Sequence, residues 1–472
     1  MLGIGEIIEA TGGNTASKGP TRFSGVSIDS RSIRKGELFF ALKGDRFDGH
    51  DFIADALKSG SGAVINSKCK IQNAKLKNKT VILVDDTVQA LHDLARYIRK
   101  SFQGPVIGII GSNGKTTTKE LVSSILNTRL KVLKTTGNLN NHIGMPLSIT
   151  RVDADAGAMV LEMGTNRPGD IDELCKIALP DTGVVTNIGF EHLEGFGSLD
   201  KVRDSELEIL PYVKRLALNA DDAFLMEGVH GRFEGEIISF GMENSTADLT
   251  AGDITFSDEG ARFSLRAGAG HIAVNSRLAG RFNIYNSLAA ASAAYAVGFS
   301  LQEIKEGLES FTGVHMRFEI RKEEGVTYLN DSYNANPSSM EESVKELVRR
   351  IRSSGHNGHK HKRAIAVLGD MLELGSYGID AHKRLGQWMS GLPVEVLIGV
   401  GPLMGLAVDE FRGKGIRTGT SEDAGKELKR IIQEGDIVLI KGSRGMKMEK
   451  VLSVTGGGGL GEPGNFSRAQ EG

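Results

Sequence analysis

The sequence predicts an α/β protein made of three domains, and two observations support this fold class. At 472 residues the chain is longer than one core usually holds, since domains average about 150 residues. Apolar runs without polar alternation, such as AMVLE at 158–162 and GVVTN at 183–187, recur between stretches with helical spacing. Such runs indicate strands buried on both faces, as in parallel sheets covered by helices.

Residues 1–103 are predicted to form a small first domain. ELFFAL, GAVI and VILVDD have the character of strands, and TVQALHDLARYIRKSF at 87–102 has apolar residues at helical spacing. The tripeptide QGP at 103–105 ends that helix, and we place the first domain boundary there.

Residues 104–312 continue the alternation of apolar runs and helical stretches, which predicts a second domain with a parallel sheet. Within this domain, 236–275 contains short strand-like pieces that predict an antiparallel extension. Residues 313–454 return to βαβ alternation, from AIAVLGD to DIVLIKGS, and predict a second doubly wound sheet. The glycine-rich tail at 455–472 is expected to be flexible.

The composition excludes several classes of protein. A net charge of −2 gives no general attraction to nucleic acid or to an anionic membrane. Two cysteines, Cys69 and Cys175, are too few for a disulfide framework or a cysteine-based zinc site. The start MLGIGEIIEATGG lacks the features of a signal peptide, and no stretch approaches about 18 apolar residues. We expect a cytoplasmic, monomeric protein without nucleic-acid partners or membrane insertion.

The stretch VIGIIGSNGKTTTKE at 106–120 joins a buried strand to a helix through a glycine turn. Backbone N–H groups at such a helix start form an anion cradle, which glycine allows a phosphate to approach closely. Lys115 is placed to neutralise the β- and γ-phosphates, and Thr116 to offer its hydroxyl to Mg²⁺. The predicted ATP contacts of this loop are Gly111, Ser112, Asn113, Gly114, Lys115, Thr116 and Thr117.

The strict phosphate-loop pattern G-x-x-x-x-G-K-[ST] is not met, because Ile109 stands where glycine is usual. A plain glycine turn is therefore the alternative, although G-K-T-T directly after a buried strand favours nucleotide binding. The loop alone leaves ATP hydrolysis, phosphoryl transfer and acyl activation open.

Further motifs narrow the reaction. GNLNNHIGMP, EMGTNRPGDI, TNIGFEHLEGFGS, GRFNIYNSLAAASAA, MRFE and NDSYNANPSSM, in this order, resemble the Mur ligase family, and DSRSIRKGELFFALKGDRFDGHDF resembles its UDP-binding module. The resemblance extends to about residue 450. NANP and HLEGFGS most resemble the members that join UDP-N-acetylmuramoyl-tripeptide (UDP-MurNAc-tripeptide) to D-alanyl-D-alanine.

The resemblance implies a three-domain ATP-dependent peptide ligase of peptidoglycan precursor synthesis. A small N-terminal α/β domain would bind the UDP-sugar, a central phosphate-loop domain would bind ATP, and a C-terminal Rossmann-like domain would bind the dipeptide. ATP would activate the peptide carboxylate as an acyl phosphate, which the incoming amine attacks through a tetrahedral intermediate, giving UDP-MurNAc-pentapeptide, ADP and phosphate. Mg²⁺ and lysine would screen the repulsion between triphosphate and carboxylate.

Two residues join Thr116 as predicted Mg²⁺ ligands. Glu162 ends the run AMVLE, so its carboxylate emerges at the carboxyl end of a strand, where open α/β sheets bind ligands. A buried carboxylate paired with a lysine is the alternative for Glu162. His192 matches the histidine that holds the second metal in the family, and a structural histidine is its alternative.

Five asparagines form the next group of candidates. Asn138, Asn140 and Asn141 lie in a glycine-flanked loop, where amides suit a charged acceptor and phosphates, and turn formation is their alternative role. The resemblance makes Asn283 and Asn286 adenine and phosphate contacts, whereas helix capping is the alternative for at least one.

The resemblance assigns two further ATP contacts to the third domain. Arg317 would reach the phosphates and Asp331 the ribose hydroxyls, so the site is complete only when this domain closes on the second. The alternative for Arg317 is a surface ion pair with Glu319 or Glu324.

Substrate contacts are implied in both terminal domains: Ser30, Arg31, Asn334, Asn336, Lys441 and Arg444. The first two match the uridine-contacting segment, where Ser30 is alternatively a turn cap. Asn334 and Asn336 lie in the loop that the resemblance associates with D-alanyl-D-alanine.

Glu206 marks a departure from the family. The resemblance implies a lysine at this position, modified by CO₂ to a carbamate beside the second Mg²⁺. The nearby Lys201 is five residues away, so it would face another side of the helix. Our hypothesis is that Glu206 is a built-in carboxylate, catalytic together with Lys115 and His192. The alternative is a solvated helix residue.

Three rival functions remain at this point. They are a sister ligase adding a single amino acid, a catalytically weak nucleotide-binding regulator and a plain phosphotransferase with the same kind of loop.

Overall fold

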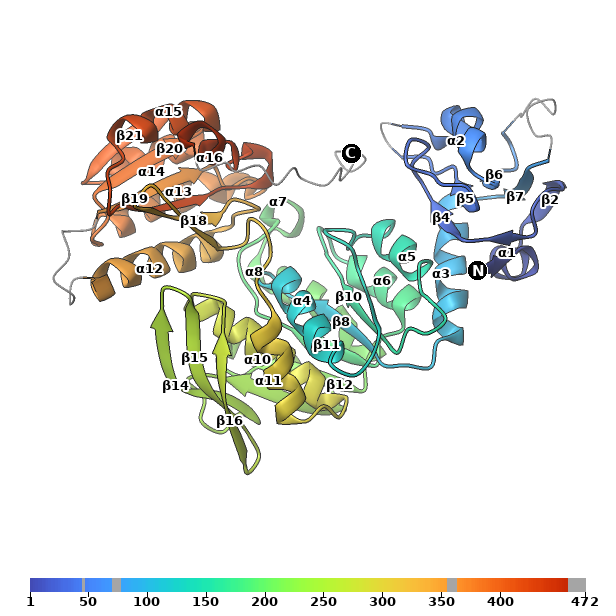
Figure 1. Cartoon of the computed structure of the whole chain (residues 1–472), viewed down its shortest axis with the longest axis horizontal. Coiled ribbons are helices and arrows are strands. Elements are labelled where there is room, and N and C mark those ends of the chain that lie inside the picture. Colours follow the sequence, from blue (N-terminus) through green and yellow to red (C-terminus); the bar gives the residue numbers. More distant parts are fainter. Residues whose placement is uncertain (45–46, 70–77, 355–362, 457–472) are drawn as a thin grey trace.

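The computed structural model describes residues 1–44, 47–69, 78–354 and 363–456. These residues form three lobes, each with its own β-sheet, and the N- and C-terminal lobes lie on opposite sides above the central one (Figure 1). The predicted flexible tail lies, from residue 457 onward, outside the described residues. No helix in the described ranges has both the length and the apolar character needed to span a membrane.

The N-terminal lobe contains a five-stranded sheet in the order β2-β7-β6-β5-β4. The four strands from β4 to β7 are parallel, and β2 pairs antiparallel with β7. Its strands are β2 (Asn14–Ser17), β4 (Gly25–Ser27), β5 (Glu37–Phe40), β6 (Gly62–Asn66) and β7 (Thr80–Val84). Its helices are α1 (Ile4–Thr11), α2 (Ile53–Ser59) and α3 (Thr87–Ser101), beside a small pair of strands, β1 (Leu2–Gly3) and β3 (Arg22–Phe23).

The central lobe has a nine-stranded sheet in the order β16-β15-β14-β13-β12-β11-β8-β10-β9. Its strands are β8 (Val106–Ile110), β9 (Val132–Lys134), β10 (Ala158–Glu162), β11 (Thr182–Val185), β12 (Arg215–Asn219), β13 (Glu236–Gly241), β14 (Leu249–Ser257), β15 (Gly260–Ala267) and β16 (Gly270–Ser276). The strands β8 to β11 are buried along their length or nearly so, apart from the short edge strand β9, as the unbroken apolar runs predict.

The antiparallel extension is present, but it begins later than predicted. β13 is parallel to both β12 and β14, and the antiparallel pairing starts between β14 and β15. The alternating burial of β14 distinguishes it from the doubly covered strands before it.

Helices cover both faces of the central sheet. α4 and α10 pack side by side on one face, and α6 and the turn at 207–212 cover the other. The helices are α4 (Lys115–Leu126), α5 (Gly144–Ile149), α6 (Asp170–Ala178), α7 (Leu193–Phe196), α8 (Leu199–Glu206), α9 (Ala223–Val229), α10 (Arg281–Ala296) and α11 (Leu301–Ser310). Close packing of α11 on α4 requires Gly307, since a Cβ there would lie 2.3 Å from the Cα of Ile125.

The C-terminal lobe has a six-stranded sheet in the order β17-β18-β22-β19-β20-β21, parallel except for β17. Its strands are β17 (Glu319–Glu323), β18 (Val326–Asp331), β19 (Ala364–Gly369), β20 (Val396–Val400), β21 (Lys414–Thr418) and β22 (Ile437–Lys441). Its helices are α12 (Pro337–Ser354), α13 (Gly378–Met389), α14 (Pro402–Glu410), α15 (Ser421–Ile431) and α16 (Lys450–Thr455). This is the second doubly wound sheet that the sequence predicts.

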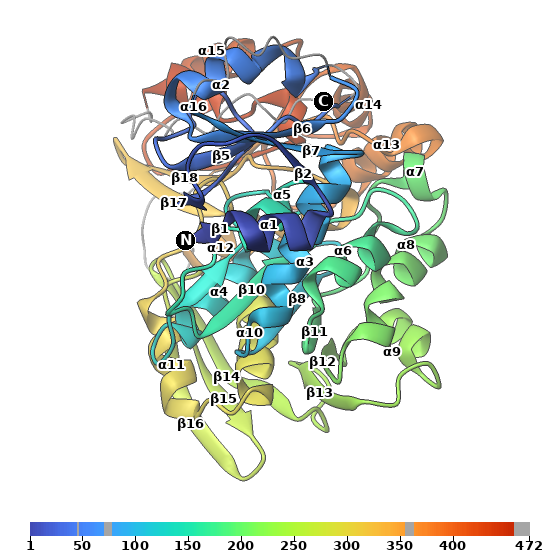
Figure 2. The ribbon, with the colours of Figure 1, turned by 90° about the vertical axis from the view of Figure 1, so that its right-hand side faces the viewer.

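Helix α3 belongs to two lobes at once. It packs on α1 in the N-terminal lobe and on α5 and α6 in the central lobe (Figures 1 and 2). Leu91 and Leu94 join the core of the N-terminal lobe, and Ala95, one residue on, joins a core of the central lobe. The limits 1–103, 104–312, 313–454 and 455–472 remain our division of the chain.

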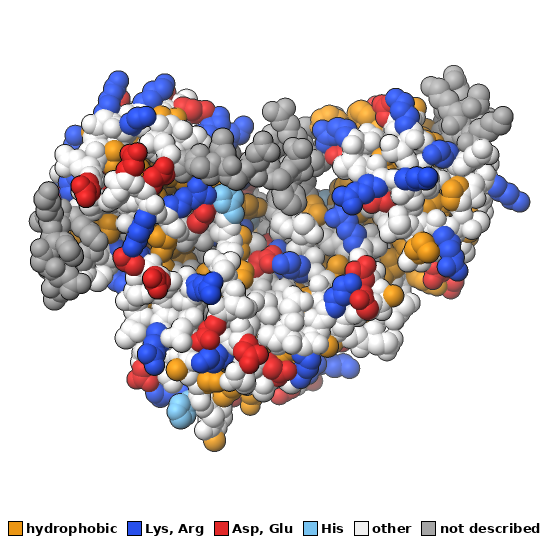
Figure 3. Space-filling model, in the orientation of Figure 1, with side chains coloured by type: hydrophobic (Ala, Val, Ile, Leu, Met, Phe, Trp, Pro, Cys, Tyr) orange, Lys and Arg blue, Asp and Glu red, His pale blue; other side chains and the backbone are white. Residues whose placement is uncertain are grey.

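Acidic and basic side chains are interspersed on the face seen in Figure 3, which is hollowed between the two upper lobes. This mixture agrees with the small net charge. An anionic ligand would therefore have to be attracted by a local site.

Candidate functional site

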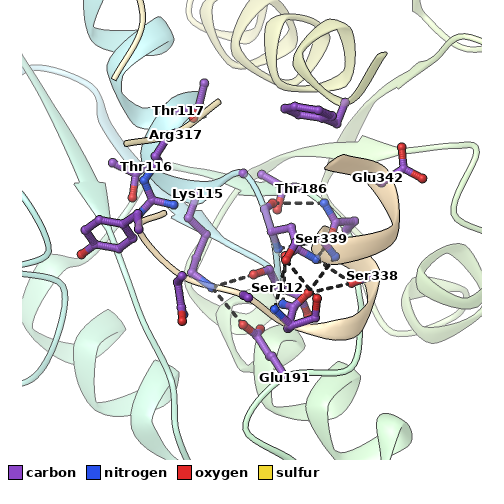
Figure 4. A pocket seen from close by; sticks show the side chains of 18 of the residues that line it. Ser112, Lys115, Thr116, Thr117, Thr186, Glu191, Arg317, Ser338, Ser339 and Glu342 are labelled. Carbon is purple, nitrogen blue, oxygen red and sulfur yellow. Dashed lines mark hydrogen bonds and ion pairs between the residues drawn. The ribbon is translucent and has the colours of Figure 1, made fainter. Parts of the chain in front are cut away.

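A cavity of about 1070 Å³ lies between the central and C-terminal lobes (Figure 4). It is lined by the turn after β8, the ends of β10 and β11, the start of α10 and the segment around Asp331. Except for Gly111, Glu206, Ser30 and Arg31, every predicted site residue lines this cavity.

The turn after β8 has a shape that its two glycines make possible. Gly111 and Gly114 have φ angles of 113° and 85°, in the left-handed region. A Cβ at Gly111 would lie 2.3 Å from Thr186 Oγ1, and one at Gly114 would lie 2.1 Å from Asn286 Oδ1. Because α4 begins at Lys115, the N–H groups of its first turn face the cavity without intrahelical partners, as an anion cradle requires.

Lys115 folds back over this turn. Its Nζ donates to the carbonyl oxygens of Gly111 and Ser112 and lies 3.6 Å from Glu191 Oε2 (Figure 4). Burial lowers the pKa of Lys115, but Glu191, Glu206 and Glu162 outweigh burial and raise that pKa above its ordinary value. The lysine is therefore a permanent cation at the turn.

For Glu162, the alternative of a buried carboxylate paired with a lysine is seen in the structure, and its role as a Mg²⁺ ligand stays a prediction. Its Oε1 accepts hydrogen bonds from Thr116 Oγ1 at 3.1 Å and Asn140 Nδ2 at 2.8 Å, which places the predicted metal ligands together. Its Oε2 lies 3.5 Å from Nζ of Lys119, a fully buried lysine. Glu162 thus has a lysine partner and still faces the cavity.

Three buried carboxylates around Lys115 each have one oxygen without a hydrogen-bond partner: Glu162 Oε2, Glu191 Oε1 and Glu206 Oε1. Buried anionic oxygens of this kind are stabilised by a cation. In the part of the chain that the structure describes, no three acidic, histidine or cysteine side chains already converge on one point. The residues fit Mg²⁺, which commonly takes one or two carboxylates and completes its shell with phosphate oxygens and water.

Glu206 is fully buried at the end of α8, so the alternative of a solvated helix residue is wrong. Its Oε2 accepts a hydrogen bond of 2.9 Å from the backbone N–H of Gly111, directly beneath the turn. Burial raises the pKa of Glu206 to about 7, against the opposing effect of Lys115. Lys201 is exposed, as its spacing predicts.

His192 lies at the cavity wall after β11, with Nδ1 2.6 Å from Glu373 Oε2 of the C-terminal lobe. Burial lowers the pKa of His192, but the hydrogen bond to Glu373 and the charge of Glu191 raise it overall. The ring both borders the cavity and contacts another lobe, so its role as a metal ligand and the structural alternative both stay predictions.

The asparagines divide by role. Asn141 Oδ1 accepts from the N–H groups of Ile143 and Gly144, so Asn141 also forms the turn that starts α5. Asn283 and Asn286 are joined by a hydrogen bond of 2.9 Å, and the N-cap of α10 is Gly280. Helix capping is therefore not the role of Asn283 or Asn286.

Several C-terminal candidates already contact one another. Lys441 Nζ lies 2.5 Å from Asp331 Oδ2 and donates to the Asn334 carbonyl oxygen at 3.0 Å. Asn336 Nδ2 donates to Asn113 Oδ1 at 2.9 Å, which joins the C-terminal lobe to the phosphate loop. Arg444 forms an ion pair with Glu449.

Arg317 lines the cavity and stacks on the ring of Tyr333, 4.0 Å from its centroid (Figure 4). Its predicted surface partner Glu319 pairs instead with Arg321. The guanidinium of Arg317 is therefore directed to the cavity.

Ser30 and Arg31 lie in the N-terminal lobe, away from the cavity lining. Asp29, not Ser30, organises this turn: its Oδ1 accepts from the backbone N–H of Arg31, and its carboxylate pairs with the guanidinium. The alternative role of Ser30 as the cap of this turn is therefore not seen, and its predicted contact with uridine stays a prediction.

Comparison with known proteins decides the family. Three Mur ligase models match consecutive parts of the chain: "Mur ligase family, catalytic domain" at 22–99, "Mur ligase middle domain" at 109–294 and "Mur ligase, glutamate ligase domain" at 316–444. The chain is 33% identical to a Bacillus subtilis protein over 95% of this chain and 96% of the relative, and 34% identical to an Escherichia coli protein over 90% and 92%. The chain belongs to the Mur ligase family.

Both relatives of this Mur ligase are named UDP-N-acetylmuramoyl-tripeptide–D-alanyl-D-alanine ligase. Among solved structures it is similar to MurF from Acinetobacter baumannii, with a TM-score of 0.87, 31% identity and coverage of 96% of this chain and 98% of that one. It is also similar to a Thermotoga maritima MurF ligase in complex with ADP, with a TM-score of 0.79, 30% identity and coverage of 91% and 96%. These matches confirm the predicted fold class.

Four residues of the Mur ligase site escaped the sequence analysis: Lys119, Asn187, Glu191 and Glu373. Asn187 Oδ1 accepts from the Asn113 N–H, and Glu191 pairs with Lys115. Asn187 stands two residues after β11, so the strand-end argument used for Glu162 could have found it, whereas Glu191 lies six residues beyond the strand, in the loop. Glu373 has no such signal, since its role depends on how two lobes meet.

Proposed function

We propose that this Mur ligase uses ATP to join UDP-MurNAc-tripeptide to D-alanyl-D-alanine, forming an amide bond with release of ADP and phosphate. One observation supports this function most: the phosphate loop and the segment NDSYNANPSSM, from different lobes, line the same cavity. Reaction of a nucleotide with two further substrates needs such a shared space. We further propose that the protein acts as a monomer.

In this proposal each lobe binds one substrate. Residues 1–103 hold the UDP-sugar through Ser30 and Arg31, 104–312 hold ATP, and 313–454 hold the dipeptide. Asn138, Asn140 and Asn141 contact the acceptor and phosphates, and Asn334, Asn336, Lys441 and Arg444 contact the dipeptide side of the cavity.

Around the nucleotide, Lys115 neutralises the transferring phosphate, which would otherwise repel the substrate carboxylate. Asn283, Asn286, Arg317 and Asp331 contact ATP. Thr116, Glu162 and His192 would hold Mg²⁺, which supplies Lewis-acid screening between the anions when bound. Lys119 orients Glu162 through its buried ion pair.

The test is reconstitution of the reaction with purified protein, ATP, Mg²⁺ and both acceptor substrates. We expect phosphate release that requires UDP-MurNAc-tripeptide and D-alanyl-D-alanine together, with the pentapeptide product identified by mass. Lys115→Ala should lower kcat at least about 100-fold, as loss of a transition-state contact does. Lys201→Ala, an exposed lysine, is the matched control.

Each rival function predicts a different result. A single amino acid replacing the dipeptide would indicate a sister ligase. A phosphorylated stable product would indicate a phosphotransferase, and nucleotide binding without acceptor-dependent turnover would indicate a regulator. Full amide synthesis by Lys115→Ala would contradict the assigned role of the loop.

We also propose that Glu206 replaces the carbamylated lysine of other family members. Its burial beneath the phosphate loop and its unpaired Oε1 support this role. Activity of the native chain should be independent of bicarbonate, and Glu206→Lys should depend on it. An unchanged Mg²⁺ dependence of the activity in Glu206→Ala would contradict this proposal.

A further inference from the structure

The loop that contains His192 is in contact with the C-terminal lobe at a defined point. His192 Nδ1 lies 2.6 Å from Glu373 Oε2, and the backbone N–H of Glu194 donates to the Glu373 carbonyl oxygen at 3.2 Å. Phe190 stacks on Tyr377, with ring centroids 5.3 Å apart and an interplanar angle of 20°. The two loops therefore meet through an ion pair, a backbone hydrogen bond and a ring stack.

The backbone is strained on both sides of this contact. His192 and Glu373 both adopt left-handed φ angles, 46° and 64°, although neither is glycine. Such conformations cost on the order of 1 kcal/mol each and persist where the surroundings impose them, most often at functional sites. Next to them, Gly375 has φ 54°, and a Cβ there would lie 3.5 Å from the Cα of Glu194.

We propose that Glu373 is the positioning residue of His192, which it orients for metal binding from across the domain boundary. This inference rests on the proposed role of His192 as a Mg²⁺ ligand. A carboxylate at Nδ1 accepts a hydrogen bond, so the proton occupies Nδ1 and the lone pair remains on Nε2. Metal-binding histidines are commonly oriented by a carboxylate in this way.

Stability of the fold is not what this pair provides. The Glu373 side chain remains 60% exposed, and exposed ion pairs contribute little to folding. Its effect is to hold the ring in one orientation and one tautomer. Because Glu373 is supplied by the C-terminal lobe, the ligand geometry of His192 then depends on where that lobe lies.

Metal affinity and lobe position are therefore coupled, and the coupling is reciprocal. A lobe that moves away removes the Glu373 carboxylate from His192, which weakens metal binding. In return, metal binding at His192 favours the arrangement in which Glu373 is in place.

The first experiment reads the His192 ring directly, without nucleotide or metal. In full-length protein with ¹⁵N-labelled histidine, NMR of the ring nitrogens identifies the tautomer, and the His192 signals are assigned by their loss in His192→Gln. Because Glu373 and Glu191 outweigh burial and raise the pKa of His192, the spectra are recorded at a pH high enough for a neutral ring, where we expect the Nδ1–H form in the native chain and a mixture of forms in Glu373→Ala. Glu194→Gln, a change at a neighbouring exposed carboxylate, should leave the ring signals unchanged.

The second experiment measures metal binding with Mn²⁺ as a paramagnetic substitute for Mg²⁺, in the presence of ADP. The Mn²⁺-binding step that involves His192 is identified by its loss in His192→Gln. The dissociation constant of this step should rise about 10- to 100-fold in Glu373→Ala, and by a smaller factor in Glu373→Gln, which keeps an acceptor oxygen. Glu194→Gln should bind Mn²⁺ like the native chain.

Two results would overturn the inference: an unchanged tautomer in Glu373→Ala, or Mn²⁺ binding as tight as or tighter than in the native chain. Tighter binding would mean that Glu373 competes with the metal. Because neither readout requires amide synthesis, a failure of the proposed function would be recognised separately, by absent turnover in the native chain.

Discussion

The central lobe of this Mur ligase shares a helix core with the N-terminal lobe, whereas it meets the C-terminal lobe through polar pairs between loops beside a few aromatic contacts, such as Phe190 on Tyr377 and Phe282 against Phe318. On the N-terminal side, Leu91 and Ala95 of one helix enter the cores of both lobes. On the other side, Asn336 bonds to Asn113 at 2.9 Å and His192 pairs with Glu373 at 2.6 Å. Apolar contacts of this kind separate only with loss of core burial, whereas polar contacts can be exchanged for water.

A third polar contact lies far from the cavity lining. Asp258, at the end of the β14–β15 hairpin, lies 2.8 Å from Lys322 and 3.7 Å from Arg350 of the C-terminal lobe. We therefore expect the N-terminal lobe to keep its position, and the C-terminal lobe to be placed by contacts that can open to admit substrates.

The largest expected effect comes from breaking the apolar contact. Leu91→Ala removes a fully buried side chain of α3 and should lower the free energy of unfolding by about 2–5 kcal/mol. We expect the N-terminal and central lobes to lose stability while the C-terminal lobe keeps its own. The only tryptophan, Trp388, lies in α13 of the C-terminal lobe, so its fluorescence reports that lobe alone.

The measurement compares denaturant unfolding by circular dichroism and by Trp388 fluorescence, with Lys100→Ala, an exposed position of α3, as the control. A shift of the Trp388 transition equal to that of the circular dichroism signal would contradict the assignment of a separable C-terminal lobe.

The second largest effect concerns Glu206, which lies beneath the phosphate loop that the C-terminal lobe contacts. This effect depends on pH. The pKa of Glu206 is raised from 4.5 to about 7 in the folded protein, so between these pH values the folded state binds more protons than the unfolded state. The contribution of Glu206 to stability is therefore full below about pH 4.5 and is lost as pH rises through about 7, a loss of roughly 3 kcal/mol.

Glu206→Gln should abolish this pH dependence, because the amide is neutral throughout. The observable is the difference in unfolding free energy between native chain and variant from pH 4.5 to 8, without nucleotide. A constant difference over that range would show that Glu206 does not titrate as its burial predicts.

Local sequence patterns predicted the parts of the site that lie on one continuous segment. The glycine turn with Lys115 and the strand-end residue Glu162 follow directly from strand–turn–helix order and from burial of unbroken apolar runs. The contact of Glu373 with His192 could not be predicted in this way, because it joins two domains and depends on their relative position. The doubly wound sheet of the C-terminal lobe followed from βαβ alternation, but the order of its strands did not, and β21, a short edge strand with exposed residues, lacks the apolar signal.

The start of the antiparallel extension shows a second limit. Glu236 and Ile237 are exposed, so β13 looks like the amphipathic strands that follow it, although it pairs parallel with β12. Whether a strand pairs parallel or antiparallel is decided by its connection in space, which no local pattern contains.

The smallest expected effect tests the polar contact away from the cavity. Asp258→Ala removes an exposed partner of Lys322 and the more distant partner of the buried Arg350, which keeps its ion pair with Glu346, so the free energy of unfolding should change by about 1 kcal/mol. The same change should broaden the distribution of C-terminal lobe positions, seen as a larger radius of gyration in solution scattering. Asp253→Ala, on the same hairpin and paired within it to Arg266, is the control. An unchanged radius of gyration in Asp258→Ala would mean that this contact does not place the lobe.

Helix α3 has a consequence for the choice of substrate. Its 15 residues rise about 22 Å, and neighbouring residues near its middle enter different cores, Leu94 that of the N-terminal lobe and Ala95 that of the central lobe. The N-terminal lobe is thereby held at a set separation from Lys115. A precursor bound at its nucleotide end by that lobe must be long enough to place its terminal carboxyl group beside Lys115. Each residue of its peptide lengthens it by at most about 3.5 Å. If the N-terminal lobe holds the UDP-sugar as proposed, we expect the ligase to discriminate against precursors whose peptide is too short to bring its carboxyl group to Lys115.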